Sequence, residues 1–198
     1  MYSAKPEPIP NVLLVSSDPS VIDGVRGTFG SDYQMLAVDD STPTIAAILE
    51  KGSPDIVVVI RESVDEDYLE ALSGLMADSP LPVLVFVFTD PYRTARAAIR
   101  LGITSFVVDA FEAARMPTLI DVTLERFEQA QSLRNELVKS QEELAARKVI
   151  DRAKGLLMDR KNMSEEEAYR ALRELAMRQA KPIREVAETL LTYSELLP

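Results

Sequence analysis

The sequence predicts an α/β protein: a doubly wound, five-stranded parallel sheet, followed by a long helix and a small three-helix bundle. Two observations predict the sheet. Apolar runs alternate with amphipathic segments five times within residues 11–122, and these runs are continuous, as in strands buried on both faces. A third observation predicts the bundle, because three apolar stripes at helical spacing follow within residues 147–198.

The strands are expected at the apolar runs and the helices at the segments between them. The strands fall at residues 11–17, 34–38, 55–60, 83–88 and 105–108. The helices fall at residues 19–29, 42–51, 65–77 and 91–101, the first of them opened by a proline. Because ligands bind at the carboxyl ends of parallel strands, residues that follow Val15, Val59, Phe88 and Val108 are the candidates for chemistry in this domain.

Residues 113–161 contain no strong helix breaker except Pro117, so we expect the last helix of the sheet domain to continue as a linker helix. Heptad spacing along it predicts a dimer seam of Ile120, Phe127, Ala130, Leu137 and Leu144. The same seam includes Thr123, Arg134 and Gln141. A coiled coil here would therefore be weak, and a solvated linker helix is the alternative.

The last three helices are bounded by local signals. The first ends near Asn162, Ser164 and Glu167 form a capping box for the second, and Pro182 marks the start of the third. The expected organisation is a tail (residues 1–10), an α/β domain (11–122), a helical coiled-coil linker (123–146) and a C-terminal bundle (147–198).

Composition excludes several functions. The 198 residues include no cysteine and no histidine, which removes disulfides, thiol nucleophiles, the usual zinc sites and histidine acid–base chemistry. We expect no enzyme activity, no cofactor and no metal. The N-terminal residues lack the apolar core of a signal peptide, and no apolar run is long enough to span a membrane, so we expect a cytoplasmic protein.

The formal charge of −10 is unevenly distributed. Residues 1–146 carry 11 basic and 23 acidic side chains, whereas residues 147–184 carry 11 basic and 6 acidic ones. Such asymmetry indicates an acidic regulatory part joined to a basic contact part.

Motifs in the basic part carry a resemblance to a known domain. Ile150-Asp-Arg-Ala-Lys-Gly-Leu-Leu-Met158, followed by Ser164-Glu-Glu-Glu-Ala-Tyr169 and Val186-Ala187, closely resembles the ANTAR domain of amidase and nitrate regulators. The order of receiver, long helix and ANTAR domain covers nearly the whole chain, and the linker, residues 126–137 onward to Ala146-Arg-Lys148, is most similar to that of the NasT-type nitrate and nitrite assimilation regulators. The resemblance implies a CheY-like receiver fold. It also implies binding to paired stem-loops in a leader mRNA, which prevents an intrinsic terminator from forming.

RNA loops are held by cations that neutralise phosphate and by planar groups that stack on bases. The predicted RNA-binding residues are Lys154, Arg147, Lys148, Arg152, Arg160, Lys161 and Arg173. Lys154 is the first candidate, because it lies in the Ala-Lys-Gly motif. Gly155 weakens a helix and so predicts close approach of a backbone or ligand. Tyr169 could stack on a base, but its place beside an apolar stripe favours a core position.

The receiver pocket that the resemblance implies lacks its usual chemistry. Ser16 and Ser17 stand where receivers carry metal-binding acids, and Ile60 stands at the phosphate-accepting aspartate. Asp109 replaces the usual lysine and would repel phosphate, while Thr89 matches the switch hydroxyl. We therefore expect control by a protein partner instead of phosphorylation. In the nitrate-type regulators that partner is a sensor of periplasmic-binding fold, which holds the regulator inactive.

Two other functions remain open from the sequence. A response regulator that binds DNA through a helix-turn-helix would also end in short helices, but the last helix begins Pro182-Ile-Arg-Glu-Val-Ala-Glu, with few base-reading side chains. A protein-interaction module without nucleic-acid binding would suit the overall negative charge.

Overall fold

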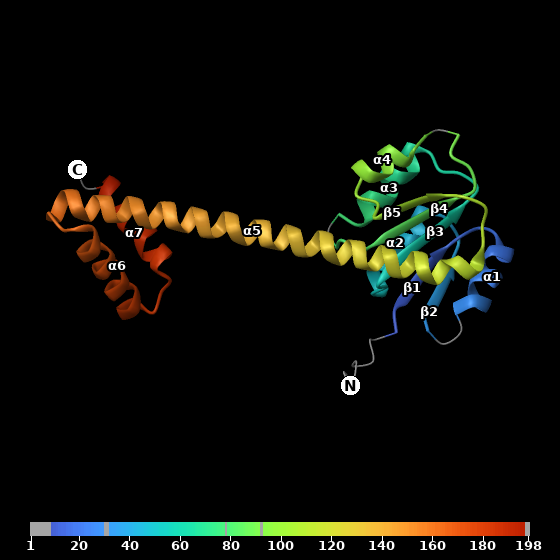
Figure 1. Ribbon diagram of the computed structural model, residues 1–198, viewed down its shortest axis with the longest axis horizontal. Helices are drawn as coiled ribbons and strands as arrows, with labels where there is room; N and C mark the ends of the chain where they lie inside the picture. The colour runs from blue at the N-terminus through green and yellow to red at the C-terminus, as the bar shows by residue number, and fades with distance from the viewer. Residues whose placement is uncertain (1–8, 30–31, 78, 92, 197–198) are drawn as a thin grey trace. The chain divides into compact units, whose positions relative to one another are not determined.

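The computed structural model describes residues 9–29, 32–77, 79–91 and 93–196, which form two compact units. The first unit extends to Gln131 and contains a five-stranded, fully parallel sheet of order β2-β1-β3-β4-β5 (Figure 1). The strands are β1 (Asn11–Val15), β2 (Gln34–Val38), β3 (Ile56–Arg61), β4 (Val83–Val87) and β5 (Ser105–Val108). The predicted fold class is confirmed.

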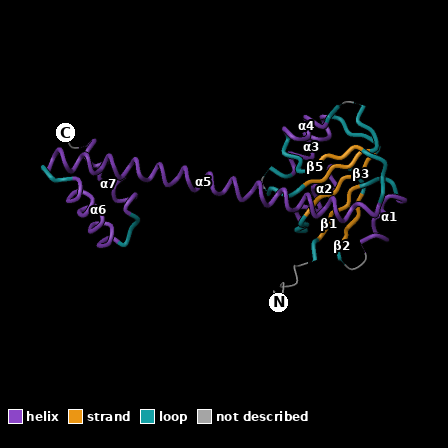
Figure 2. The backbone as a smooth tube through the Cα atoms, in the orientation of Figure 1, coloured by secondary structure: helices purple, strands orange, loops and turns teal. Residues whose placement is uncertain are grey.

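Helices cover both faces of this sheet. One face packs against α2 (Thr42–Lys51), α3 (Glu66–Leu75) and α4 (Ala95–Arg100), and the other against α1 (Pro19–Phe29) and the start of α5 (Met116–Lys161) (Figure 2). A short 3-10 helix, Ala113–Arg115, precedes α5. Because both faces are covered, the strands are continuous apolar runs.

The second unit, from Ser132 onward, is built from the C-terminal part of α5 with α6 (Glu165–Gln179) and α7 (Ile183–Leu196). Its core is small, and the buried residues of its hydrophobic cluster are Ala153, Leu172, Ala176, Val186 and Ala187. The capping box is present, since the Ser164 hydroxyl accepts from the Glu167 amide and the Glu167 carboxylate accepts from the Ser164 amide.

Element boundaries differ from expectation where a polar side chain caps the chain. Asp65 lies outside α3, because its carboxylate accepts a hydrogen bond from the Tyr68 amide as the N-cap. Helix α4 begins four residues later than predicted, because the Asp90 carboxylate accepts from the amide and hydroxyl of Thr94 and holds a turn there. Pro182 precedes α7 instead of opening it.

The start of α5 belongs to the sheet domain. Ile120 is fully buried in the core cluster beneath α1, and the buried Thr123 hydroxyl donates to Leu119 O and Ser105 Oγ. Ile120 is therefore part of the receiver core and is not exposed as the predicted seam requires. Phe127 is partly buried, and Ala130, Leu137 and Leu144 are exposed. None of the helices in the described part of the chain is both long and apolar enough to cross a membrane.

Candidate receiver pocket and nucleic-acid interface

A hollow of about 510 Å³ lies at the carboxyl ends of β1 and β3. Because Val15 pairs with Val59 across these strands, the residues that follow them, Ser16 and Ile60, reach the same edge of the sheet. Ser16, Ser17 and Ile60 all line the hollow. Ile60 is only 1% exposed and has no nucleophilic atom, so this position cannot accept a phosphoryl group.

Thr89 and Asp109 do not line this hollow. The exposed Thr89 hydroxyl donates to the carbonyl oxygen of Glu62 at 3.3 Å. The Asp109 carboxylate forms an ion pair with Arg115 at 2.7 Å, and this hydrogen-bonded partner lowers the pKa of Asp109. Asp109 is thus neutralised from outside the hollow, which weakens the phosphate repulsion expected from it.

Arg61, the last residue of β3, supplies a positive charge in the hollow. Its Nε lies 3.4 Å from the Asp40 carboxylate, which also accepts a hydrogen bond from the Ser17 hydroxyl. The Arg61 guanidinium carbon lies 4.3 Å from the centroid of the Tyr68 ring on α3, a cation–π contact. Burial raises the pKa of Tyr68, while Arg61 opposes that rise. The guanidinium therefore ties β3 to the loop after β2 and to α3.

Nothing in the apolar pattern marked Arg61 as a pocket residue, although it directly follows five buried positions of β3. That placement, a cation at the carboxyl end of a buried parallel strand, is the signal that could have identified it.

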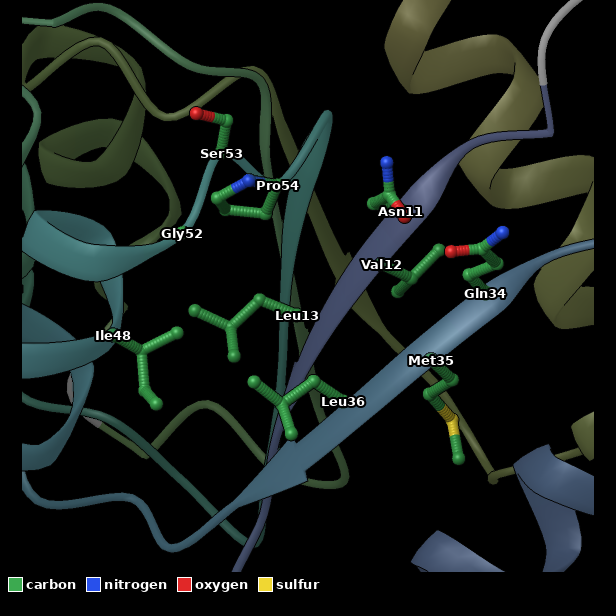
Figure 3. A pocket seen from close by; sticks show the side chains of 10 residues that line it. All are labelled: Asn11, Val12, Leu13, Gln34, Met35, Leu36, Ile48, Gly52, Ser53 and Pro54. Atoms are coloured by element: carbon green, nitrogen blue, oxygen red, sulfur yellow. The ribbon is translucent and has the colours of Figure 1, made fainter.

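A different hollow, of about 370 Å³, lies at the amino ends of β1 and β2 and beside the end of α2 (Figure 3). Leu13, Leu36 and Ile48 line it together with Gly52 and Pro54, and none of the described side chains that line it is titratable. Because it lies at the opposite edge from the carboxyl ends of the strands, it is not where a parallel sheet normally places a polar ligand.

The predicted RNA-binding cations are all on the second unit, but they differ in exposure and partners. Most of the side chains are exposed: Arg147, Lys148, Arg152, Arg160, Lys161 and Arg173. Lys154 differs, with a side chain only 15% exposed. Its ammonium lies 2.7 Å from the Asp151 carboxylate and 2.7 Å from that of Glu165, at the start of α6.

These two carboxylates change how Lys154 can act. The hydrogen bond to Asp151, with a second to Glu165, raises the pKa of Lys154, and the same contact lowers the pKa of Asp151. Because two negative groups surround one positive group, the unbound chain offers no net attraction for phosphate at this point. Lys154 instead links α5 to the first turn of α6.

Gly155 does not occupy a crowded position. A Cβ atom built there would meet no other atom within 4 Å, so packing inside the chain does not require a glycine. The expected close approach of another backbone segment is therefore wrong. Tyr169, for which a core position was favoured, is 45% exposed and lines a hollow of about 400 Å³ with Arg147 and Lys154.

Comparison with solved structures identifies the fold of the first unit. It is similar to a CheY-like response regulator receiver domain protein from Methanospirillum hungatei, with a TM-score of 0.53 and 12% identity over 62% of this chain and 99% of that one. It is also similar to the chemotaxis protein CheY4 of Vibrio cholerae, with a TM-score of 0.50 and 15% identity over 59% and 99%. The unit therefore has the receiver fold.

The C-terminal part can be assigned to a particular domain family, since residues 139–191 match the ANTAR domain. The "Transcriptional regulatory protein PdtaR" of Mycobacterium tuberculosis is 23% identical over 92% of this chain and 90% of its own length. The "Nitrate regulatory protein" of Klebsiella oxytoca is 35% identical over 39% of this chain, which spans only 20% of that protein. The chain thus carries an ANTAR domain after a receiver-type domain, and both relatives are regulatory proteins.

Proposed function

We propose that this chain is an RNA-binding antitermination regulator that binds paired stem-loops in a leader transcript. The observation that supports it most is the ANTAR domain at residues 139–191, on which the exposed cations of the chain's basic part are concentrated. Such cations bind RNA by neutralising phosphates and releasing counterions. The resemblance to NasT-type regulators and the partial match to a nitrate regulatory protein favour a nitrate or nitrite assimilation operon.

The proposed phosphate contacts are the exposed cations of α5 and α6: Arg147, Lys148, Arg152, Arg160, Lys161 and Arg173. Lys154 acts in this interface as a positioning residue, because its two ion pairs hold the start of α6 against α5.

The test is a binding measurement with a library of two-hairpin RNAs that carry randomised short loops. Full-length protein should select hairpins, and its affinity for them should fall steeply between 50 and 200 mM salt, by about tenfold or more for several phosphate contacts. The selected sequence as duplex DNA is the control for a DNA-binding regulator. Tighter binding to the duplex DNA, or selection of no RNA at all, would contradict the proposal.

Control by a protein partner, and not by phosphorylation, is supported by the receiver pocket. Ile60 cannot accept phosphate, Ser16 and Ser17 are poor substitutes for metal-binding acids, and Arg61 already neutralises Asp40. The proposed partner is a sensor protein of periplasmic-binding fold that holds the chain inactive. Incubation with acetyl phosphate and Mg²⁺ should leave the intact mass unchanged, whereas an added phosphate of about 80 Da would refute this part.

An active homodimer would pair through the exposed apolar residues of α5. Leu133, Leu137 and Leu144 are 67%, 59% and 56% exposed and, with Ala130, follow heptad spacing. This proposed seam adds Leu133 and leaves out two residues of the predicted seam, the buried Ile120 and the partly buried Phe127. Leu137→Asp should convert RNA-bound dimers to monomers in light scattering, with Glu136→Asp as the control; a dimer that survives Leu137→Asp would exclude this seam.

A further inference from the structure

A second hollow of the ANTAR domain lies where α5 and α7 end together. It measures about 220 Å³, and Leu156, Leu157 and Leu190 form its apolar floor. Tyr193 stands beside this floor with 63% of its surface exposed. The ring and the leucines together form a contiguous exposed apolar surface, and such surfaces can mark binding sites.

Two cations complete the lining of this hollow. Arg160 and Lys161 occupy the last turn of α5. The Arg160 guanidinium donates to the Ser194 carbonyl at 3.3 Å, which fixes its place beside the end of α7. Lys161 is exposed and makes no ion pair within the described part of the chain, so its charge is available to an anion.

The contrast with the hollow at Tyr169 shows which of the two suits a nucleic acid. Glu143 and Asp151 line the Tyr169 hollow together with Arg147 and Lys154, and Lys154 is already paired with two carboxylates. Among the described residues, the lining of the Tyr193 hollow contains Arg160 and Lys161 and no acid. Because Lys161 makes no ion pair with a described residue, a phosphate group would be attracted more strongly to the Tyr193 hollow than to the Tyr169 hollow.

We propose that the Tyr193 hollow binds one unpaired nucleobase of an RNA hairpin loop. The base lies over the leucine floor and stacks on the Tyr193 ring, while Lys161 contacts the adjoining phosphate. Stacking on an aromatic side chain with cation contacts to the backbone is how proteins hold unpaired bases. This inference rests on the proposed RNA-binding function and adds the subsite that would distinguish a looped transcript from a fully paired stem.

The experiment uses the full-length chain and the hairpin that it selects from the randomised library, labelled for fluorescence anisotropy. Tyr193→Ala should weaken binding by at least about fivefold, the loss expected for one base stack, whereas Tyr193→Phe should stay within about twofold. Tyr169→Ala is the matched control, since it removes the other exposed tyrosine of the described ANTAR unit, and it should also stay within twofold. Lys161→Ala should reduce the slope of log affinity against log salt by about one.

A cross-linking experiment tests the proposed contact between the base and Tyr193 directly, without relying on binding affinity alone. Hairpins with 5-iodouridine at each loop position in turn should cross-link to Tyr193 from one position, and thermal unfolding of Tyr193→Ala should match the wild type. If the wild type binds hairpins but Tyr193→Ala binds equally well, or if the cross-link maps to Tyr169, the subsite is refuted and the proposed function stands. If the wild type binds no hairpin, both are refuted.

Discussion

The receiver unit and the ANTAR unit have hydrophobic cores of very different size. The receiver sheet is covered on both faces, and each face has its own cluster of large buried side chains, such as Leu14 on one and Leu69 on the other. The ANTAR unit has one cluster, in which three of the five buried members are alanines and Leu172 is the only large one. Because burial of apolar area stabilises in proportion to its amount, the ANTAR unit is the less stable of the two.

The two units also treat charge differently. In the receiver hollow Arg61 pairs with Asp40, one of three acids among its described lining residues, whereas most cations of the ANTAR unit are exposed. The charges of the receiver hollow are therefore partly paired within the chain, while most cations of the ANTAR unit are accessible to solvent.

The largest effect is expected at Leu172, which is 1% exposed. Leu172→Ala should lower the free energy of unfolding of the ANTAR unit by about 2–5 kcal/mol, because it leaves a cavity in a small core. Chemical denaturation should then separate into two transitions, with the receiver transition unchanged. Met177→Ala, on the same helix and 73% exposed, is the control. A single transition that shifts as a whole would mean that the two units unfold together.

A smaller effect is expected at Arg61. Arg61→Met removes one partly exposed ion pair and one cation–π contact, so the receiver transition should lose about 1–2 kcal/mol while RNA affinity is unchanged. Arg100→Met, which removes a more exposed ion pair with Glu66, should cost less. An equal cost for both variants would show that the Arg61 contacts add nothing to the receiver pocket.

The link between α5 and α6 gives the next test. If Lys154 acts by positioning α6, then Lys154→Met and Glu165→Gln should weaken hairpin binding alike, by about two- to fivefold in anisotropy titrations. Either variant removes the same ion pair. Tighter binding by Glu165→Gln would show instead that Lys154 contacts phosphate directly once its carboxylate partner is removed.

The smallest effect is expected at Gly155. Because an added Cβ would meet no described atom within 4 Å outside the adjacent residues and the local helix backbone, Gly155→Ala should stabilise the ANTAR unit by about 0.5–1 kcal/mol in thermal unfolding. If RNA approaches the backbone here, the same variant should bind hairpins more weakly in spite of its higher stability. A lower melting temperature would contradict the open surroundings of this glycine.

Apolar periodicity and cap residues predicted most of the helices and strands well, because both depend on interactions between residues that are close in sequence. The strands β2 and β5 and the helices α1 and α2 have the predicted bounds, and the capping box at Ser164 is present. Boundaries were missed where a side chain from outside the element satisfies its first amides, as Asp90 does before α4.

The candidate sites were less predictable, because pairing of charges depends on contacts between elements. The spacing of Lys154 along α5 is the same whether or not Glu165 of the next helix reaches it. The heptad pattern likewise cannot show that Ile120 faces the sheet, since a core position and a dimer position have the same periodicity. The position of Ile60 was easier to predict, because it depends only on the register of one buried strand, and Ile60 does line the hollow at the carboxyl end of β3.

The positive charge of Arg61 is covalently part of the chain, unlike a bound ion or a transferred phosphoryl group. It cannot be diluted away, chelated or hydrolysed. If the proposed control by a partner holds, this pocket has no phosphoryl group whose hydrolysis would end a response. The duration of a response would then be set by how long the partner or the transcript stays bound.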